Sequence, residues 1–139
     1  MQIIIDSNIL IFANNASMPE QKQSLHIIEE MIASDFHFIV NSIIISETYH
    51  ILTRMLGKNE AMARTHAILS SKFITYLPIS FDVINKALLT SCDKEIRIND
   101  AVIGTQALLN ARGILTDNIK DFIKIDGLHI IPLRKKELT

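Results

Sequence analysis

The sequence predicts an α/β fold, a three-layer α-β-α sandwich around a short central parallel sheet. Short β-branched runs alternate along the chain with longer amphipathic stretches, and this alternation favours parallel strands joined by right-handed crossovers. Only four glycines and three prolines interrupt the 139 residues, and no repeat or linker divides them. We therefore expect a single domain over residues 1–139, which is long enough to bury one substantial core.

The expected strands are short apolar runs that end at polar or turn residues. The first, Gln2–Ile5, is β-branched and ends at Asp6, where a helix begins at once. Pro78 closes the third run. In chain order, the expected strands are residues 2–5, 37–40, 73–77, 114–116 and 128–131.

Helices are expected between the strands, where apolar residues recur three and four positions apart. Pro19 suits a first helical turn, Asn41 and Ser80 are typical caps, and Gly57 and Gly113 are typical stops. After the helix that follows the first strand, the expected helices are residues 19–33, 43–56, 59–71, 80–94 and 99–112, and residues 117–122 form a turn or a single helical turn.

Composition and charge exclude several classes of protein. The single cysteine, Cys92, forms no intrachain disulfide and belongs to no zinc cluster. The first residues lack the basic stretch of a secretory signal, and no run of about 18 apolar residues predicts a membrane span, so we expect a cytoplasmic protein. The net charge is −1, and the only basic run is Arg134-Lys135-Lys136. The 48% hydrophobic content favours an oligomer or a bound partner.

Acidic residues follow the predicted strands at one edge of the sheet. Asp6 follows the first strand, Asp117 and Asn118 follow the fourth, and Asp100 opens a helix. Glu47 lies one turn into the helix after the second strand, within an apolar stripe. In open α/β sheets, ligands bind at the carboxyl ends of the strands, so these side chains form a candidate site.

A purely structural interpretation exists for most of these acids. Asp6 and Asp100 are suited to cap the helices that they open, and Asp117, Asn118 and Asp121 are suited to a turn. Capping does not explain Glu47, because an unpaired carboxylate on an apolar stripe is costly to bury. Several independent coincidences at one edge are less probable than one site.

Converging carboxylates repel one another and require a cation. All of the candidate ligands are oxygens, which suit Mg²⁺ or Mn²⁺, and the five histidines show no metal-binding spacing. Such a metal can activate water and stabilise charge on a phosphodiester, as in metal nucleases. The chain contains no P-loop motif and no GxGxxG after the first strand, so neither type of nucleotide site is expected.

Four segments resemble the motifs of PIN-domain proteins, above all the VapC-type ribonuclease toxins of VapBC toxin-antitoxin systems. They are Ile5-Asp6-Ser7-Asn8-Ile9-Leu10, Ser46-Glu47, Asn99-Asp100-Ala101-Val102-Ile103-Gly104, and Thr116-Asp117-Asn118-Ile119-Lys120-Asp121-Phe122. Each motif is short, but their order and spacing over nearly the whole chain are specific. The resemblance implies that Asp6, Glu47 and Asp100 bind Mg²⁺ or Mn²⁺, and that Ser7 or Asn8 orients Asp6 or the metal-bound water.

The fourth acidic position departs from the strict motif. The residue two positions after Thr116 is Asn118, with acids at Asp117 and Asp121 on either side. The identity of the fourth ligand therefore stays open among these three residues, as does the number of metals.

The resemblance implies a metal-dependent endoribonuclease with an RNA substrate, a cognate antitoxin and a homodimeric form. Two alternatives are a PIN-like interaction protein without catalysis and a receiver-like signalling module. A receiver would need paired acids directly after the first strand, and the chain has a single acid there.

Overall fold

The computed structural model describes residues 1–134. Within them, one five-stranded sheet has the strand order β3-β2-β1-β4-β5, and all four neighbouring pairs are parallel. This arrangement confirms the expected three-layer α/β fold. The strands are β1 (Gln2–Ile5), β2 (His37–Val40), β3 (Ile74–Tyr76), β4 (Ile114–Thr116) and β5 (Ile130–Pro132). The helices are α1 (Ser7–Ala13), α2 (Gln21–Ala33), α3 (Ser42–Leu56), α4 (Lys58–Ser70), α5 (Phe81–Lys94), α6 (Ile98–Asn110) and α7 (Ile119–Phe122).

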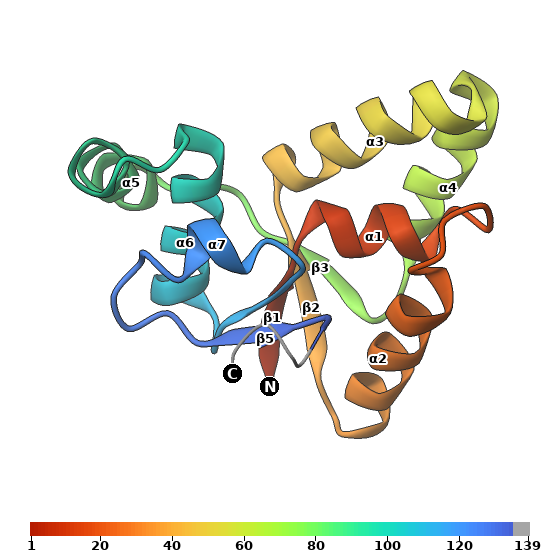
Figure 1. The fold of residues 1–139 in the computed structure, drawn as a ribbon, viewed down its shortest axis with the longest axis horizontal. Coiled ribbons are helices and arrows are strands. Elements are labelled where there is room, and N and C mark those ends of the chain that lie inside the picture. Colours follow the sequence, from red (N-terminus) through yellow and green to blue (C-terminus); the bar gives the residue numbers. More distant parts are fainter. Residues whose placement is uncertain (135–139) are drawn as a thin grey trace.

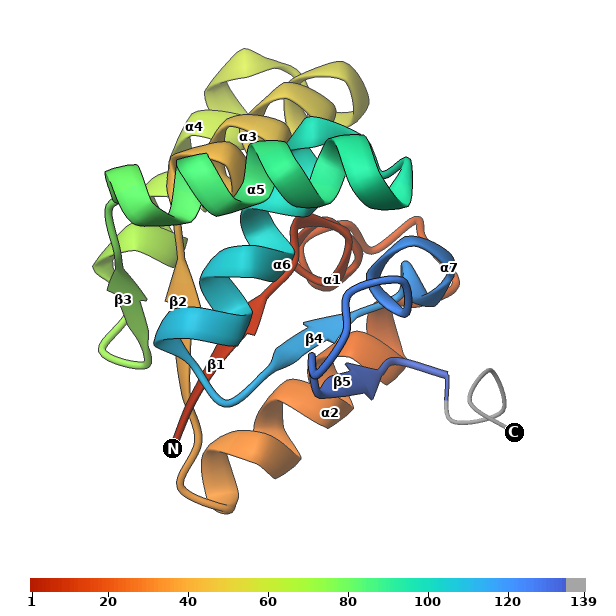
Figure 2. The ribbon, with the colours of Figure 1, turned by 90° about the vertical axis from the view of Figure 1, so that its left-hand side faces the viewer.

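The helices form a layer on each side of the sheet. Figure 1 shows α5, α6 and α7 on one side of the strands and α1 to α4 on the other, and Figure 2 shows the sheet between α6 and α2. Because both faces are covered, the strands are apolar throughout: Ile3, Ile4 and Ile5 of β1 are each at most 1% exposed. In Figure 1, β1 and β2 run upward and end where α1 and α3 begin.

Several expected boundaries shift by one or two residues. The helix expected from Asn99 begins at Ile98 with Arg97 as its N-cap, so Asp100 lies in its first turn and is not its cap. The helix expected from Pro19 begins at Gln21. In each case the backbone enters the helical conformation at a position that the sequence motif does not fix.

A buried polar network joins α3 to α6. The Asn41 side chain caps α3 by accepting a hydrogen bond from the Ile44 amide (2.9 Å), and it donates to Gln106 Oε1 (2.8 Å). Gln106 Nε2 in turn donates to the carbonyls of Leu77 and Pro78. Asn41 and Gln106 are fully buried. The network therefore ties together the two helices that carry Glu47 and Asp100.

No helix within residues 1–134 is long and apolar enough to cross a membrane.

Candidate active site

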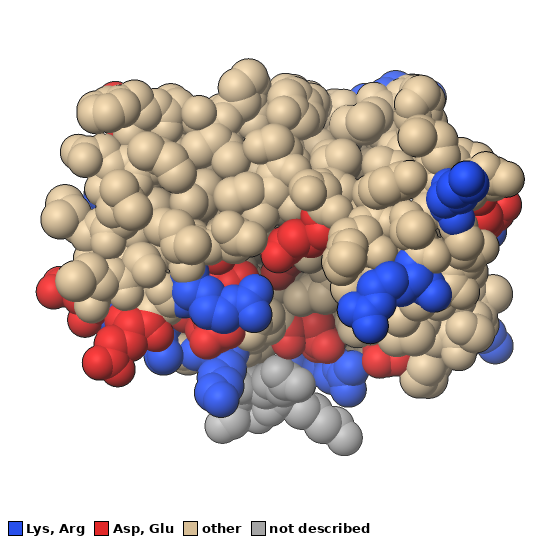
Figure 3. All heavy atoms as spheres, turned by 90° about the horizontal axis from the view of Figure 1, so that it is seen from above, with Lys and Arg blue, Asp and Glu red and all other residues tan. Residues whose placement is uncertain are grey.

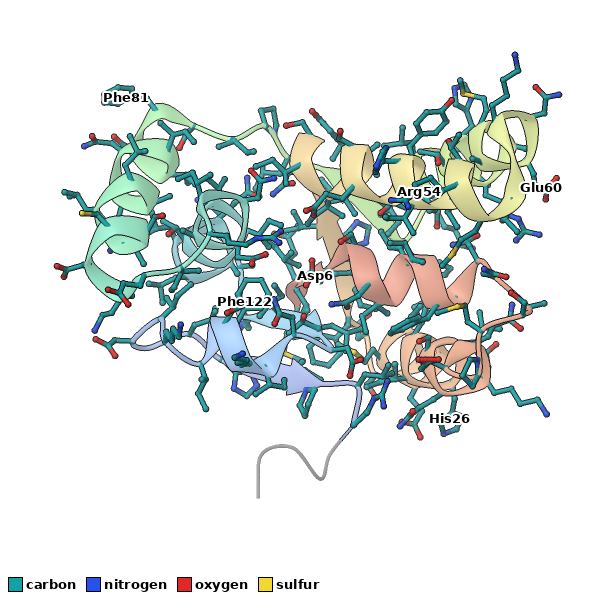
Figure 4. All side chains as sticks on the ribbon, turned by 45° about the horizontal axis from the view of Figure 1, so that its top comes forward. Asp6, His26, Arg54, Glu60, Phe81 and Phe122 are labelled. Atoms are coloured by element: carbon teal, nitrogen blue, oxygen red, sulfur yellow. The ribbon has the colours of Figure 1, made fainter. Side chains whose placement is uncertain are left out.

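Carboxylates from three elements meet at the edge where the strands end. Asp6 directly follows β1, Glu47 lies in α3, and Asp100 lies in the first turn of α6. Figure 4 shows Asp6 at the start of α1, in the middle of the molecule, and Figure 3 shows acidic side chains in the centre of this face with basic ones on either side. The charges of Glu47 and Asp100 both act on Asp6, so the three acids lie within electrostatic reach of one another.

Asp6 is the most deeply buried of these acids, at 4% exposed. Its Oδ1 accepts a hydrogen bond from the Ser7 amide (2.8 Å), and its Oδ2 accepts from Thr116 Oγ1 (2.7 Å) and Asn8 Nδ2 (3.3 Å). Burial raises the pKa of Asp6 from 3.8 to about 6, although the hydrogen bonds from Thr116 and Ser7 oppose the rise. Three donors thus fix a carboxylate that is costly to ionise.

Glu47 is half-buried beside Asp6. Its Oε1 accepts a hydrogen bond from Ser7 Oγ (3.3 Å). Burial raises the pKa of Glu47, the bond from Ser7 lowers it, and the charge of Asp100 raises it further. Ser7 therefore contacts two acids at once, through its backbone amide and through its hydroxyl.

Asp100 and Asp121 face each other across α6 and α7. Burial raises the pKa of Asp100, the nearby Arg97 guanidinium lowers it, and the charge of Asp121 raises it. The Nε of Arg97 lies 3.8 Å from Asp100 Oδ2. α7 and the residues after it lie close to α6 because Gly104 has no side chain: a Cβ there would overlap Ile125 Cδ1 and lie 3.2 Å from the Phe122 ring.

Asp117 and Asn118 make other contacts. The Asp117 carboxylate accepts two hydrogen bonds from Arg134, at 3.1 and 3.2 Å, and Arg134 also reaches Glu20. The backbone amide of Asn118 donates to Thr116 Oγ1 (2.9 Å). Of the three candidates for the fourth position, Asp121 is the one whose charge acts on Asp100. Lys135 and Lys136, the rest of the basic run, lie outside the described residues.

The donor set suits a hard divalent cation. Asp6, Glu47 and Asp100 supply only oxygen ligands, and burial together with repulsion by a neighbouring carboxylate raises the pKa of each, an unfavourable state that a cation would relieve. As they stand, no three Asp, Glu, His or Cys side chains within residues 1–134 are grouped closely enough to hold an ion. Asp6 and Glu47 both accept hydrogen bonds from Ser7, and Asp100 is paired with Arg97.

Thr116 and Arg97 were not singled out from the sequence as site residues. Thr116 Oγ1 contacts Asp6 directly and accepts the Asn118 amide, so it links β4 to β1 at the site. The sequence offered one indication of its role, because Thr116 is the first residue of the fourth motif. Arg97 precedes Asp100 by three residues, the spacing at which helical side chains become neighbours.

The sequence matches the family model of the PIN domain over residues 3–128. No curated protein matches the chain.

Several solved structures share the fold. VapBC2 from Rickettsia felis, in a structure bound to a DNA fragment from the promoter, has a TM-score of 0.74 at 22% identity, with 95% of this chain and 98% of that chain covered. DNA-bound VapBC from Salmonella typhimurium has a TM-score of 0.75 at 16% identity, covering 96% and 99%. VapC20 from Mycobacterium tuberculosis, described as a toxin that cleaves the sarcin-ricin loop, has a TM-score of 0.63 at 18% identity, covering 81% and 86%.

Proposed function

The chain belongs to the PIN domain family, and from this premise we propose that it is a metal-dependent endoribonuclease, the toxin of a toxin-antitoxin pair. One catalytic domain over residues 1–139 would hydrolyse RNA phosphodiester bonds in the cytoplasm. The single observation that carries this proposal is the meeting of Asp6, Glu47 and Asp100 at the carboxyl edge of the sheet, each with a raised pKa.

In the proposed site, Asp6, Glu47 and Asp100 bind Mg²⁺ or Mn²⁺, and Asp121 is the fourth acid. The ion, when bound, lowers the pKa of water and stabilises the negative charge that develops on the phosphate. Hydrolysis adds water across the phosphorus–oxygen bond, and the products carry 5′-phosphate and 3′-hydroxyl ends.

The chain's own groups prepare this chemistry by orientation. The Ser7 amide, Asn8 Nδ2 and Thr116 Oγ1 hold both oxygens of Asp6, so the carboxylate is positioned before any ligand arrives. Ser7 Oγ holds Glu47 toward the same place. Arg97, whose side chain is 76% exposed beside Asp100, is placed to contact an RNA phosphate.

The proposed partners are RNA, a second copy of the chain and an antitoxin. The neighbouring VapBC structures are toxin-antitoxin complexes, which supports an antitoxin partner for this chain. Large apolar side chains on the surface support association with protein: Leu89 is 69% exposed and Ile123 is 62% exposed.

The decisive experiment is cleavage of a mixed cellular RNA pool by the purified protein with Mg²⁺, with Mn²⁺ or with EDTA. We expect metal-dependent cleavage that EDTA abolishes and that Asp100→Ala lacks. Asp117→Asn is the matched control, because Asp117 is paired with Arg134, and this variant should still cut. Cleavage by Asp100→Ala at the wild-type rate would contradict the site.

The two alternatives give different results. A PIN-like interaction protein without catalysis would cut no RNA and would bind no divalent metal in calorimetry. A receiver-like module would acquire a phosphoryl group from acetyl phosphate, whereas the proposed nuclease would not.

A further inference from the structure

A hollow lies near the acids, between α3 and α4 at the end of β3. It has a volume of about 390 Å³, and Tyr49, Met62, His66 and Tyr76 form much of its wall. Tyr76 and Met62 are each 49% exposed. Among residues 1–134, no Asp or Glu lines this hollow. We refer to it as the tyrosine pocket.

The shape of the tyrosine pocket follows from helix periodicity. The α3 residues that line it are positions 42, 45, 46 and 49, and the α4 residues are positions 62, 65, 66 and 69. Both sets have the spacing that places side chains on one helix face. The two helices meet at Gly57, whose positive φ of 88° turns the chain between them. The two faces therefore form opposite walls of one groove.

Thr65 gives the pocket an unsatisfied polar group. Its hydroxyl is one of three buried side-chain oxygens or nitrogens within residues 1–134 that have no hydrogen-bond partner, and the residue is 5% exposed. Thr48 and Thr53, on α3, each donate instead to the carbonyl four residues earlier, at 2.7 Å. A buried hydroxyl without a partner is costly. Thr65 Oγ1 has almost no solvent-accessible surface, so it can pair with a ligand only once its side chain turns toward the hollow.

The tyrosine pocket adjoins the acidic site. A smaller hollow of about 320 Å³ is lined by Ser42, Ser46, Glu47 and Asn99. Ser42 and Ser46 line the tyrosine pocket as well, so the two hollows share a wall. Tyr76 ends β3, so the pocket also lies at the carboxyl edge of the sheet. A ligand at Glu47 can therefore extend into the tyrosine pocket.

We propose that the tyrosine pocket binds one unstacked nucleobase next to the phosphodiester that is cut, and so sets sequence preference. This inference rests on the proposed nuclease function. Aromatic rings stack on bases, and single-stranded RNA is recognised by such stacking together with hydrogen bonds to base edges. Tyr49 and Tyr76 supply the rings, and the exposed His66 lies on the same wall. A protein partner seated here would cover Ser42 and Ser46, the wall shared with the hollow at Glu47, whereas an RNA strand bound at Glu47 would extend over that wall.

The test is to map the cut sites in a random single-stranded RNA pool with Mg²⁺, by sequencing the 5′ ends of the fragments. We expect the wild type to prefer certain bases at one position beside the cut. Thr65→Val should change the preference at that position alone. Tyr76→Ala should flatten the preference and slow cleavage of the preferred sequence by about tenfold or more, because a stacking partner is lost. Tyr76→Phe should keep the wild-type base preference and cleavage rate, since it keeps the aromatic ring.

Phe81→Ala is the matched control, because it removes an exposed aromatic ring from α5, outside the tyrosine pocket. It should cut the wild-type sites at the wild-type rate. Unchanged cut sites and rates in Thr65→Val and Tyr76→Ala would overturn the proposal that the tyrosine pocket binds a base. The proposed nuclease function would still stand. A wild type that cuts no RNA would overturn both. If Tyr76→Ala instead alters the oligomeric state in sedimentation equilibrium and leaves base preference unchanged, the pocket holds a second copy and the proposal is wrong.

Discussion

Asp6→Asn should stabilise the metal-free protein at neutral pH while abolishing RNA cleavage. Asp6 is 4% exposed, and its ionised form is opposed by burial and by the charges of Glu47 and Asp100. The amide of asparagine has nearly the same shape and carries no charge. The variant therefore removes an electrostatic penalty from the native state and at the same time removes a proposed metal ligand.

The size of the effect follows from the pKa of Asp6. A rise from 3.8 to about 6 corresponds to roughly 3 kcal/mol, at about 1.4 kcal/mol per pKa unit. Below pH 3.8 the carboxyl is protonated in both the native and the unfolded states, so there is no penalty. Between about pH 4 and pH 6 the unfolded chain releases the proton and the native site retains it, so the free energy of unfolding falls as the pH rises. Above pH 6 the penalty is constant.

Urea unfolding in EDTA at several pH values from 4 to 8 measures this difference. Asp6→Asn should gain about 3 kcal/mol on the wild type between pH 4 and pH 7, in addition to a pH-independent cost from the poorer fit of the amide to the three donors. Saturating Mg²⁺ should reverse the order, because an ion at 1,000 times its Kd adds about 4.1 kcal/mol to the wild type alone.

A constant difference between the two proteins across this pH range would refute the reasoning, because it would show that the charge of Asp6 carries no penalty. The slope that remains in Asp6→Asn serves as the internal control, since Glu47 and Asp100 titrate in both proteins.

Three further variants test the packing around the site. Gly104→Val should destabilise the protein by about 1 to 3 kcal/mol in thermal unfolding, because the added atoms would overlap the Ile125 side chain and press on Phe122 of α7; an unchanged Tm would contradict the close approach. Gln106→Leu should lower the urea midpoint by the equivalent of about 2 to 3 kcal/mol, since it leaves Asn41 Nδ2 buried without its acceptor; a loss under about 0.5 kcal/mol would argue against the network. Arg134→Ala should cost less than about 1 kcal/mol and leave RNA cleavage intact, because its pairing with Asp117 is part-exposed; loss of cleavage would instead show that this pair supports the site.

The sequence predicted which acids lie at the site edge, because Asp6 follows a strand, Asp100 lies at the start of a helix, and Glu47 interrupts the apolar stripe of another helix. Asp6 shows why the structural and the functional interpretations need not exclude each other. It caps α1, accepting the Ser7 amide, and it also faces Glu47 and Asp100. For Asp100 the capping interpretation is wrong, since Arg97 occupies the N-cap position.

The sequence does not predict distances between segments that lie far apart in the chain. Thr116 lies 110 residues from Asp6 and contacts it at 2.7 Å, and only the pairing of β1 with β4 brings them together. The same holds for the fourth acidic position. The motif leaves Asp117, Asn118 and Asp121 open, whereas the pairing with Arg134 engages Asp117, and the packing of α7 on α6 sets Asp121 near Asp100.

The sequence by itself determined the fold class, the approximate place of each strand and helix, and the acids at the carboxyl edge. These follow from local hydrophobic periodicity and from caps and stops that act over a few residues. The tertiary structure decided which side chains interact electrostatically, which form hydrogen bonds and which line the same hollow. Those relations depend on the packing of α3, α4, α6 and α7, and such packing joins residues that no local pattern relates.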